Sequence, residues 1–198
     1  MSDNENFIKI NIMTLGNSAV GKTSFILKYT EDIFREVHLS TIGIDFKTKK
    51  IKFKDGKNYK VDFYDTAGQE KYKSISINTI KNADGILLMY DITNRESFEA
   101  ISNWMKGIID RKGNDFPIIL VGNKIDKENE REVTKEEGKQ IGDKYRINFI
   151  EMSIKTGENV EECALELINK IIEKENINNS QNIKLGKNIN DNEKKCCK

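Results

Sequence analysis

The stretch Gly16-Asn17-Ser18-Ala19-Val20-Gly21-Lys22-Thr23 decides the fold of this chain. It matches the pattern G-x-x-x-x-G-K-[ST], in which a glycine-rich loop curls so that successive backbone N–H groups and a helix N-terminus surround an anion. Residues 7–15 before it alternate apolar and other side chains as a strand does, and residues 24–29 after it have apolar side chains at helical spacing. The sequence therefore predicts a phosphate-binding loop between a strand and a helix, with Lys22 reaching the outer phosphates and the Thr23 hydroxyl available to Mg²⁺.

Strands and helices alternate along the rest of the chain. Residues 45–53 and 58–64 are predicted strands, joined through Lys54-Asp55-Gly56-Lys57, whose Asp-Gly pair favours an antiparallel hairpin. Short apolar runs typical of buried parallel strands lie at 85–90 and 117–122, and a last short strand is expected at 147–151. Helices are expected at 95–111, 134–145 and 160–172. The predicted fold class is α/β, a P-loop fold whose mostly parallel six-stranded sheet has one antiparallel edge strand and helices on both faces.

Composition excludes several classes of protein. The 198 residues fit one domain, or one domain with a tail, and 33 Lys and Arg against 32 Asp and Glu disfavour a nucleic-acid-binding protein. No apolar run approaches the roughly 18 residues that cross a bilayer, and residues 1–6 lack the order of a signal peptide, so we expect a reducing compartment. One His and three scattered Cys cannot form a structural zinc site. Ser/His/Asp chemistry is also disfavoured, because the only candidate base is His38, whose surroundings are typical of a loop.

The apolar periodicity fades at about residue 175. Residues 175–198 include seven Asn and five Lys, a composition typical of a disordered tail. We therefore predict a folded domain over residues 1–174 and a disordered tail over 175–198. Cys163 lies on an apolar stripe of the predicted helix 160–172 and is expected in the core.

Two further motifs follow predicted strands, at the sheet edge where such folds bind ligands. In Asp65-Thr66-Ala67-Gly68-Gln69, Asp65 can hold a Mg²⁺-bound water, the Gly68 N–H can approach a terminal phosphate, and Gln69 can orient an attacking water. In Asn123-Lys124-Ile125-Asp126, the Asp126 carboxylate can accept hydrogen bonds from the N1–H and amine of guanine, whereas adenine offers no such pair. Each motif alone also fits an ordinary polar turn. Together with the phosphate loop they predict a guanine nucleotide site.

Over about residues 7–174 these motifs resemble the small Ras-like GTPases, and the Rab branch most of all. The resemblance rests on the motifs Gly16–Ser24, Thr41-Ile42-Gly43-Ile44-Asp45-Phe46, Asp65–Glu70, Leu88–Thr93, Asn123–Asp126 and Ser153-Ile154-Lys155. It implies a Ras-like G domain that binds GTP or GDP with Mg²⁺ and hydrolyses GTP slowly, as a molecular switch in vesicle and membrane trafficking. Since no arginine is evident in the nucleotide loops, we expect hydrolysis to depend on an activating partner.

The resemblance also implies residue roles. Thr41 would close on Mg²⁺ and the γ-phosphate, and Phe34 would lie against the guanine ring. The implied catalytic residues are Gln69, Lys22 and Gly68, and the implied metal ligands are Thr23, Thr41 and Asp65. The implied nucleotide-binding residues are Gly16, Ser18, Ala19, Val20, Gly21, Lys22, Thr23, Ser24, Phe34, Ser40, Thr41, Gly68, Asn123, Lys124, Asp126, Ser153, Ile154 and Lys155. The implied effector face consists of Ile42, Gly43, Ile44, Asp45, Phe46 and Tyr64.

Three departures from the family pattern predict a divergent Rab. Ile154 replaces the usual Ala of Ser-Ala-Lys and needs space, although its backbone N–H is kept. Tyr64 stands where the family typically has Trp, and Thr79-Ile80-Lys81-Asn82 replaces the usual Tyr-Tyr-Arg-Gly. The last two departures lie near the effector face, so we expect the nucleotide chemistry to be kept and the partner-selecting aromatic surface to be altered.

The ending Lys194-Lys195-Cys196-Cys197-Lys198 resembles a Rab double-cysteine prenylation signal. Two geranylgeranyl groups, on Cys196 and Cys197, would anchor the chain stably, whereas one lipid gives only marginal binding. The expected location is the cytoplasmic face of an intracellular membrane, with cycling through the cytosol. The expected partners are an exchange factor, a GTPase-activating protein, effectors, a prenylation escort protein and a GDP-dissociation inhibitor.

Two other functions stay open. A Ras- or Rho-type signalling GTPase is disfavoured because the tail lacks a C-a-a-X ending and no insert helix interrupts residues 123–134. A nucleotide-binding module without turnover is disfavoured by Gln69 and Thr41.

Overall fold

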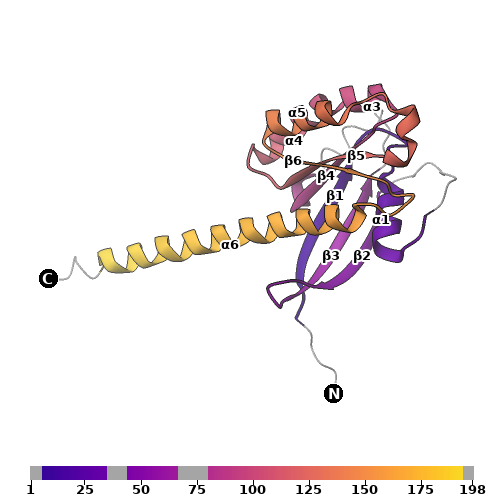
Figure 1. Cartoon of the computed structure of the whole chain (residues 1–198). Coiled ribbons are helices and arrows are strands. Elements are labelled where there is room, and N and C mark those ends of the chain that lie inside the picture. The colour runs from indigo at the N-terminus through magenta and orange to yellow at the C-terminus, as the bar shows by residue number, and fades with distance from the viewer. Residues whose placement is uncertain (1–5, 35–43, 67–79, 194–198) are drawn as a thin grey trace, which may run out of the picture.

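The fold is a six-stranded sheet between two layers of helices (Figure 1). The computed structural model describes residues 6–34, 44–66 and 80–193. The sheet has the order β2-β3-β1-β4-β5-β6, in which only β2 runs antiparallel to its neighbour. The strands are β1 (Ile8–Leu15), β2 (Ile44–Lys52), β3 (Asn58–Thr66), β4 (Gly85–Asp91), β5 (Ile118–Asn123) and β6 (Asn148–Met152). The predicted fold class is thus confirmed, edge strand included.

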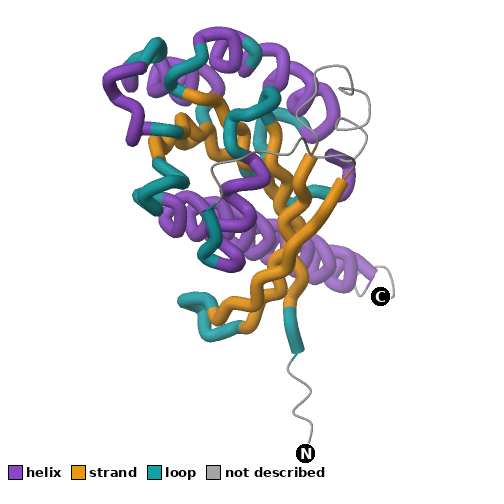
Figure 2. Tube along the Cα trace, turned by 90° about the vertical axis from the view of Figure 1, so that its right-hand side faces the viewer, coloured by secondary structure: helices purple, strands orange, loops and turns teal. Residues whose placement is uncertain are grey.

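Helices cover both faces of the sheet (Figure 2). Helices α1 (Lys22–Glu31) and α6 (Val160–Glu193) pack on one face, and α4 (Ile101–Lys112) and α5 (Lys135–Tyr145) pack on the other. The short elements are η2 (Ile80–Asn82), α3 (Arg95–Glu99) and η3 (Ile125–Glu130). The single helix expected over 95–111 is divided at Ala100 into α3 and α4.

Local sequence signals explain where several elements begin and end. The Asn94 side chain accepts a hydrogen bond from the Ser97 N–H and caps α3. Thr134 and Glu137 form a reciprocal capping box at the start of α5. In the β2–β3 hairpin, Gly56 takes a φ of +79°, which an L-residue rarely adopts.

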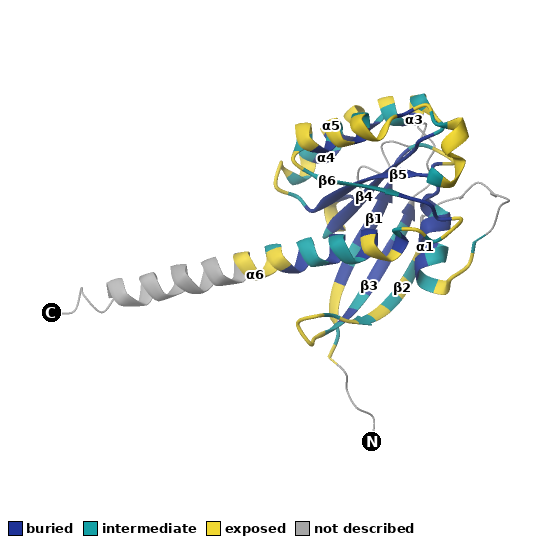
Figure 3. Ribbon diagram, viewed as in Figure 1, coloured by how far each residue is buried: buried dark blue, intermediate teal, exposed yellow. Residues whose placement is uncertain are grey.

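The sheet separates two apolar clusters. One contains residues of α1 and α6, such as Phe25 and Leu167, and the other contains residues of α4, such as Trp104 and Ile108. Every residue of β4 and β5 is buried, as expected for parallel strands covered on both faces (Figure 3).

Helix α6 carries the chain away from the sheet (Figure 1). Among the residues of α6 whose burial is described, up to 177, the last buried apolar residue is Ile172, close to residue 174, where the composition places the domain boundary. The division into a domain and a disordered tail stays a prediction, and the bounds of α6 extend beyond it to Glu193. Within the described ranges, every helix is too short or too polar to cross a membrane. Cys163 is fully buried in α6, as expected, and burial raises the pKa of its thiol.

Candidate functional site

The predicted motifs gather at one edge of the sheet. The phosphate loop follows β1, Asp65 lies near the end of β3, Asn123 ends β5, and Ser153 follows β6. These four strands are parallel, so their carboxyl ends meet at the same edge. The topology thus brings together residues that are separated by more than a hundred positions in the sequence.

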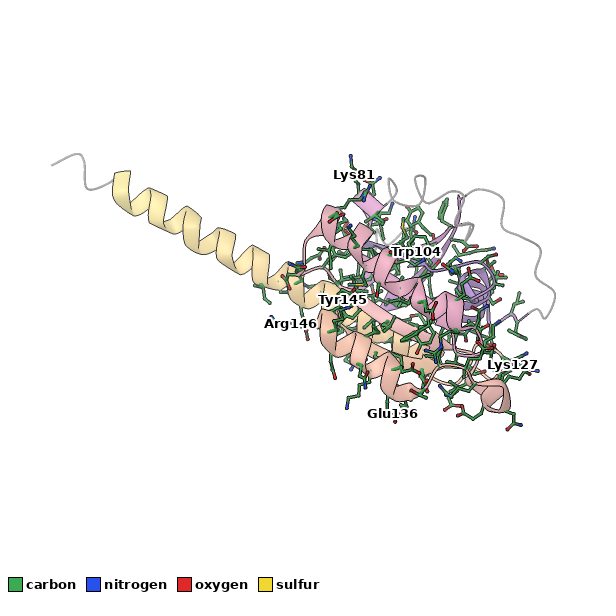
Figure 4. All side chains as sticks on the ribbon, turned by 90° about the horizontal axis from the view of Figure 1, so that it is seen from above. Lys81, Trp104, Lys127, Glu136, Tyr145 and Arg146 are labelled. Atoms are coloured by element: carbon green, nitrogen blue, oxygen red, sulfur yellow. The ribbon has the colours of Figure 1, made fainter. Side chains whose placement is uncertain are left out.

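The phosphate loop wraps around its own lysine. Lys22 Nζ donates hydrogen bonds to the carbonyl oxygens of Gly16, at 3.0 Å, and Asn17, at 2.6 Å, and the residue is buried. Trp104 on α4, labelled in Figure 4, supports the loop from outside through a 3.1 Å hydrogen bond from its Nε1 to Asn17 Oδ1. A buried ammonium group and the N-terminus of α1 both face the loop, which suits a strongly anionic ligand.

A hydroxyl and a carboxylate meet beside this loop. Thr23 Oγ1, in the first turn of α1, donates a 2.6 Å hydrogen bond to Oδ2 of the buried Asp65 on β3. Mg²⁺ prefers oxygen ligands and takes few of them from protein side chains, so this pair fits such an ion with phosphate and water completing its shell. Over the described residues, no group of three or more His, Cys, Asp or Glu could hold a metal alone.

Asn123 connects the phosphate loop to the loop after β6. Its Nδ2 donates to the Val20 carbonyl oxygen at 2.9 Å, and its Oδ1 accepts from the Ile154 N–H at 3.3 Å. Gly21 lies against the side chains of Asn123 and Ile154 at a φ of +108°, and a Cβ there would stand 2.4 Å from Asn123 Nδ2 and 2.9 Å from Ile154 Cδ1. The missing side chain of Gly21 therefore provides the space that the unusual Ile154 needs.

The predicted base-recognition residues are held by hydrogen bonds between loops. Ser153 Oγ donates to Oδ1 of the exposed Asp126 at 2.6 Å, which orients that carboxylate. Lys124 Nζ lies 2.5 Å from Asp91 Oδ2. The other oxygen of Asp91 accepts hydrogen bonds from the N–H and hydroxyl of Thr93, at 2.9 and 2.8 Å. The Asp126 carboxylate and the Lys124 ammonium group, both shortly after β5, are thus each held by a partner from another segment.

Three supporting residues were not predicted as part of the site: Asp91, Trp104 and Arg131. Asp91 had a signal, because an acid followed by Thr93 directly after a fully apolar strand lies at the ligand edge. Trp104 had none, because its partner Asn17 lies 87 positions away along the chain. The guanidinium group of Arg131 pairs with Glu128, three positions away, and with Glu151, 20 positions away. Only the tertiary contacts identify Trp104 and the pair of Arg131 with Glu151.

The described part of the predicted effector face is aromatic. Phe46, which is 56% exposed, stacks on Tyr64 across the β2–β3 pair, with 5.8 Å between ring centroids. Tyr64 also donates a long 3.4 Å hydrogen bond to Asn11 Oδ1, a contact that the tryptophan usual at this position could not make in the same way. The surface therefore keeps its aromatic character and gains a phenolic hydroxyl.

Of the remaining predicted residues, some lie within the described ranges and the others lie outside them. Phe34 is half-buried against the α1–α6 cluster, Ala19 has a φ of +60°, Ser24 is buried, Lys155 is exposed, and Ser18 lies in the turn before α1. Ile44 and Asp45 pair with β3 through the backbone of β2. Outside the described residues lie Ser40, Thr41, Ile42, Gly43, Gly68, Gln69, Cys196 and Cys197. The roles assigned to all of these residues stay predictions.

Comparisons with known proteins match this chain over nearly the whole domain. A family model described as the Ras family matches residues 11–173. Ras-related protein Rab-3A of Homo sapiens is 42% identical over 174 residues, which cover 87% of this chain and 79% of that protein. Ras-related protein Rab-3C of Bos taurus is 41% identical over 174 residues, covering 87% and 76%. Ras-related protein Rab-8B of Homo sapiens is 41% identical over 165 residues, covering 83% and 79%.

Proposed function

The chain belongs to the Ras family of small GTPases and within it to the Rab branch, and from this premise we propose how its carboxyl-edge site binds and hydrolyses GTP. As a Rab-like GTPase it binds GTP and GDP and acts in membrane trafficking. The observation that carries the proposal is the position of Asn123, whose side chain joins the phosphate loop at Val20 to the base loop at Ile154. One residue thereby fixes the separation between the phosphate end and the base end of the site.

At the phosphate end, Lys22 and the backbone N–H groups of residues 16–23 neutralise the phosphates. Lys22 Nζ, which the carbonyl oxygens of Gly16 and Asn17 hold inside the loop, donates to phosphate oxygens when nucleotide enters. Thr23 and Asp65, which meet at 2.6 Å, would hold Mg²⁺, and Thr41 would be a further ligand. The ion would supply positive charge that offsets the charge of the phosphates.

At the base end, Asp126 selects guanine. Its carboxylate accepts hydrogen bonds from N1–H and the exocyclic amine of the base, and the Ser153 hydroxyl keeps it oriented. The stem of Lys124, fixed by Asp91, covers the base from one side, and Phe34 covers it from the other. The loop that contains Ile154 and Lys155 lines the carbonyl edge of the base.

Hydrolysis transfers the γ-phosphoryl group of GTP to water. Gln69 orients the water, whose oxygen bonds to the γ-phosphorus as the bond from phosphorus to the bridging oxygen breaks, giving GDP and inorganic phosphate. The Gly68 N–H and Lys22 stabilise charge on the γ-phosphate oxygens. Loss of that phosphate releases Thr41 and Gly68, and this release is the switch that effectors, exchange factors and activating proteins read at Phe46 and Tyr64.

Membrane attachment is assigned to Cys196 and Cys197. Two geranylgeranyl groups hold the chain on the cytoplasmic face of an intracellular membrane, and a GDP-dissociation inhibitor returns it to the cytosol. Prenylation needs an escort protein that presents the tail. Mass spectrometry of the C-terminal peptide from cells tests this assignment, and unmodified cysteines would remove it.

A single-turnover GTP hydrolysis assay tests the enzymatic mechanism. We expect the wild-type chain to hydrolyse bound GTP slowly and Gln69→Leu to hydrolyse it more slowly still. Equal rates would show that Gln69 does not orient the water. Tight GTP binding with no turnover in the wild type would identify a nucleotide-binding module instead.

A further inference from the structure

The guanidinium group of Arg131 uses all five of its N–H donors. Toward Glu128, Nε donates to Oε1 at 2.8 Å and Nη2 to Oε2 at 2.7 Å. Toward Glu151, Nη1 donates to Oε1 at 2.7 Å and Nη2 to Oε2 at 3.2 Å, and Nη1 also donates to the Val133 carbonyl oxygen at 2.9 Å. These hydrogen bonds raise the pKa of Arg131 further above its ordinary value. The planar fork of arginine makes two bidentate pairs at once, which lysine cannot do.

The two carboxylates come from the two base-recognition loops. Glu128 lies in η3, two residues after Asp126, and Glu151 lies in β6, two residues before Ser153. Figure 4 labels Lys127, between Asp126 and Glu128, at the edge of the domain away from the projecting end of α6. The Arg131 bridge thus spans the same two segments that the 2.6 Å hydrogen bond from Ser153 to Asp126 joins.

The bridge is anchored at both ends. The N–H groups of Glu132 and Val133, directly after Arg131, both donate to the Ile92 carbonyl oxygen beyond the end of β4. The Glu151 side chain is only 8% exposed, and its backbone oxygen accepts a 2.8 Å hydrogen bond from Asn159 Nδ2. Because both ends are fixed to the body of the domain, the bridge can set the distance between the loops.

We propose that Arg131 is a positioning residue for guanine recognition, which holds η3 against β6 so that the Asp126 carboxylate faces the N1–H and amine of the base. This inference rests on the proposed guanine site. Arg131 touches no part of the base itself and acts through Asp126 and Ser153.

The chain contains a matched control in Arg95. Its guanidinium forms a bidentate pair with Glu137, with donor–acceptor distances of 2.6 and 3.2 Å, and donates to the Glu132 carbonyl oxygen. Arg95 therefore resembles Arg131 in chemistry, but it joins α3 to α5 and to Glu132, and these partners lie outside η3 and β6. Arg95→Gln therefore tests how the loss of a comparable ion pair near the same end of the domain affects nucleotide binding.

The experiment compares the binding of GDP with that of inosine diphosphate, which lacks the exocyclic amine that would donate a hydrogen bond to Asp126. Dissociation constants of both are measured by calorimetry for the wild type, Arg131→Gln, Arg131→Lys and Arg95→Gln. We expect the wild type to prefer GDP by roughly 10- to 100-fold, the value of one hydrogen bond to a charged group. Arg131→Gln should lower this preference at least about threefold, Arg131→Lys should lower it also, and Arg95→Gln should leave it unchanged.

If the role of Arg131 were purely structural, Arg131→Gln would weaken the binding of both nucleotides equally. An unchanged preference for GDP over inosine diphosphate in this variant therefore overturns the inference. The double variant Arg131→Gln/Glu151→Gln removes the buried carboxylate that the single variant leaves uncompensated. A reduced preference that persists in the double variant supports positioning, and a full return to the wild-type preference overturns it. If the wild type binds GDP but does not prefer it, the inference falls while GTPase function stands. If the wild type binds neither nucleotide, both fall.

Discussion

Replacing Gly21 by alanine adds one carbon atom where the phosphate loop meets both base-binding loops. At a φ of +108°, an L-residue costs about 1–2 kcal/mol. The new Cβ would lie 2.4 Å from Asn123 Nδ2, so the amide has to move away and leave the Val20 carbonyl oxygen. An unsatisfied buried carbonyl costs about 1–3 kcal/mol more. We therefore expect Gly21→Ala to lower the free energy of unfolding by roughly 2–5 kcal/mol.

Only the second contribution concerns the nucleotide, because Asn123 positions both ends of the site. A loss of about 1–3 kcal/mol in nucleotide binding corresponds to a GDP affinity roughly 5- to 150-fold weaker. Release of a fluorescent GDP analogue, followed by stopped flow with excess GDP, measures this effect as a faster dissociation rate. Denaturant unfolding in saturating GDP measures the stability.

Gly56→Ala is the matched control. Gly56 has a φ of +79°, but a Cβ there would meet nothing within 4 Å, and the residue lies at the end of β3 opposite to Asp65. We expect this variant to lose about 1–2 kcal/mol of stability and to keep the wild-type rate of GDP release. If both variants released GDP at the same rate, the reasoning that Asn123 connects the two ends of the site would be refuted.

Three further outcomes are expected. Asp126→Asn should weaken GDP binding roughly 100-fold or more and favour xanthosine diphosphate, whose C2 carbonyl accepts from the new amide; unchanged GDP affinity by calorimetry would contradict guanine selection by this residue. The Arg95 guanidinium first, and then hydrogen bonds from Thr134, lower the pKa of Glu137 from 4.5 to about 2, so the stability from these contacts is present above pH 4.5 and lost as the pH falls toward 2. The difference in thermal midpoint between the wild type and Arg95→Gln should accordingly shrink over that range, and a constant difference would contradict the pairing. Cys163 should not react with a thiol reagent until the protein unfolds, because its thiol is buried and its pKa is raised; rapid labelling of a variant with both C-terminal cysteines replaced by serine would contradict this.

The sequence by itself determined the fold class and predicted the chemistry of the site. The phosphate-loop pattern, the Asp-Gly hairpin and the two buried apolar runs specify a doubly wound sheet, because each is a local signal with its own physical cause. Asp65 and Asn123 were predicted as site residues because each lies at the end of a predicted strand, at the ligand edge, and Ser153 was predicted from the family resemblance.

The tertiary structure decided how these residues support one another. The hydrogen bond of Asn123 to Val20, the fit of Ile154 beside Gly21 and the bidentate pair of Arg131 with Glu151 all join separate segments of the chain. Local patterns carry no information on such contacts, because the contacts arise only when strand order and packing bring the segments together. Residue types therefore predicted which chemistry this protein performs, and the order of its strands decided which side chains hold that chemistry in place.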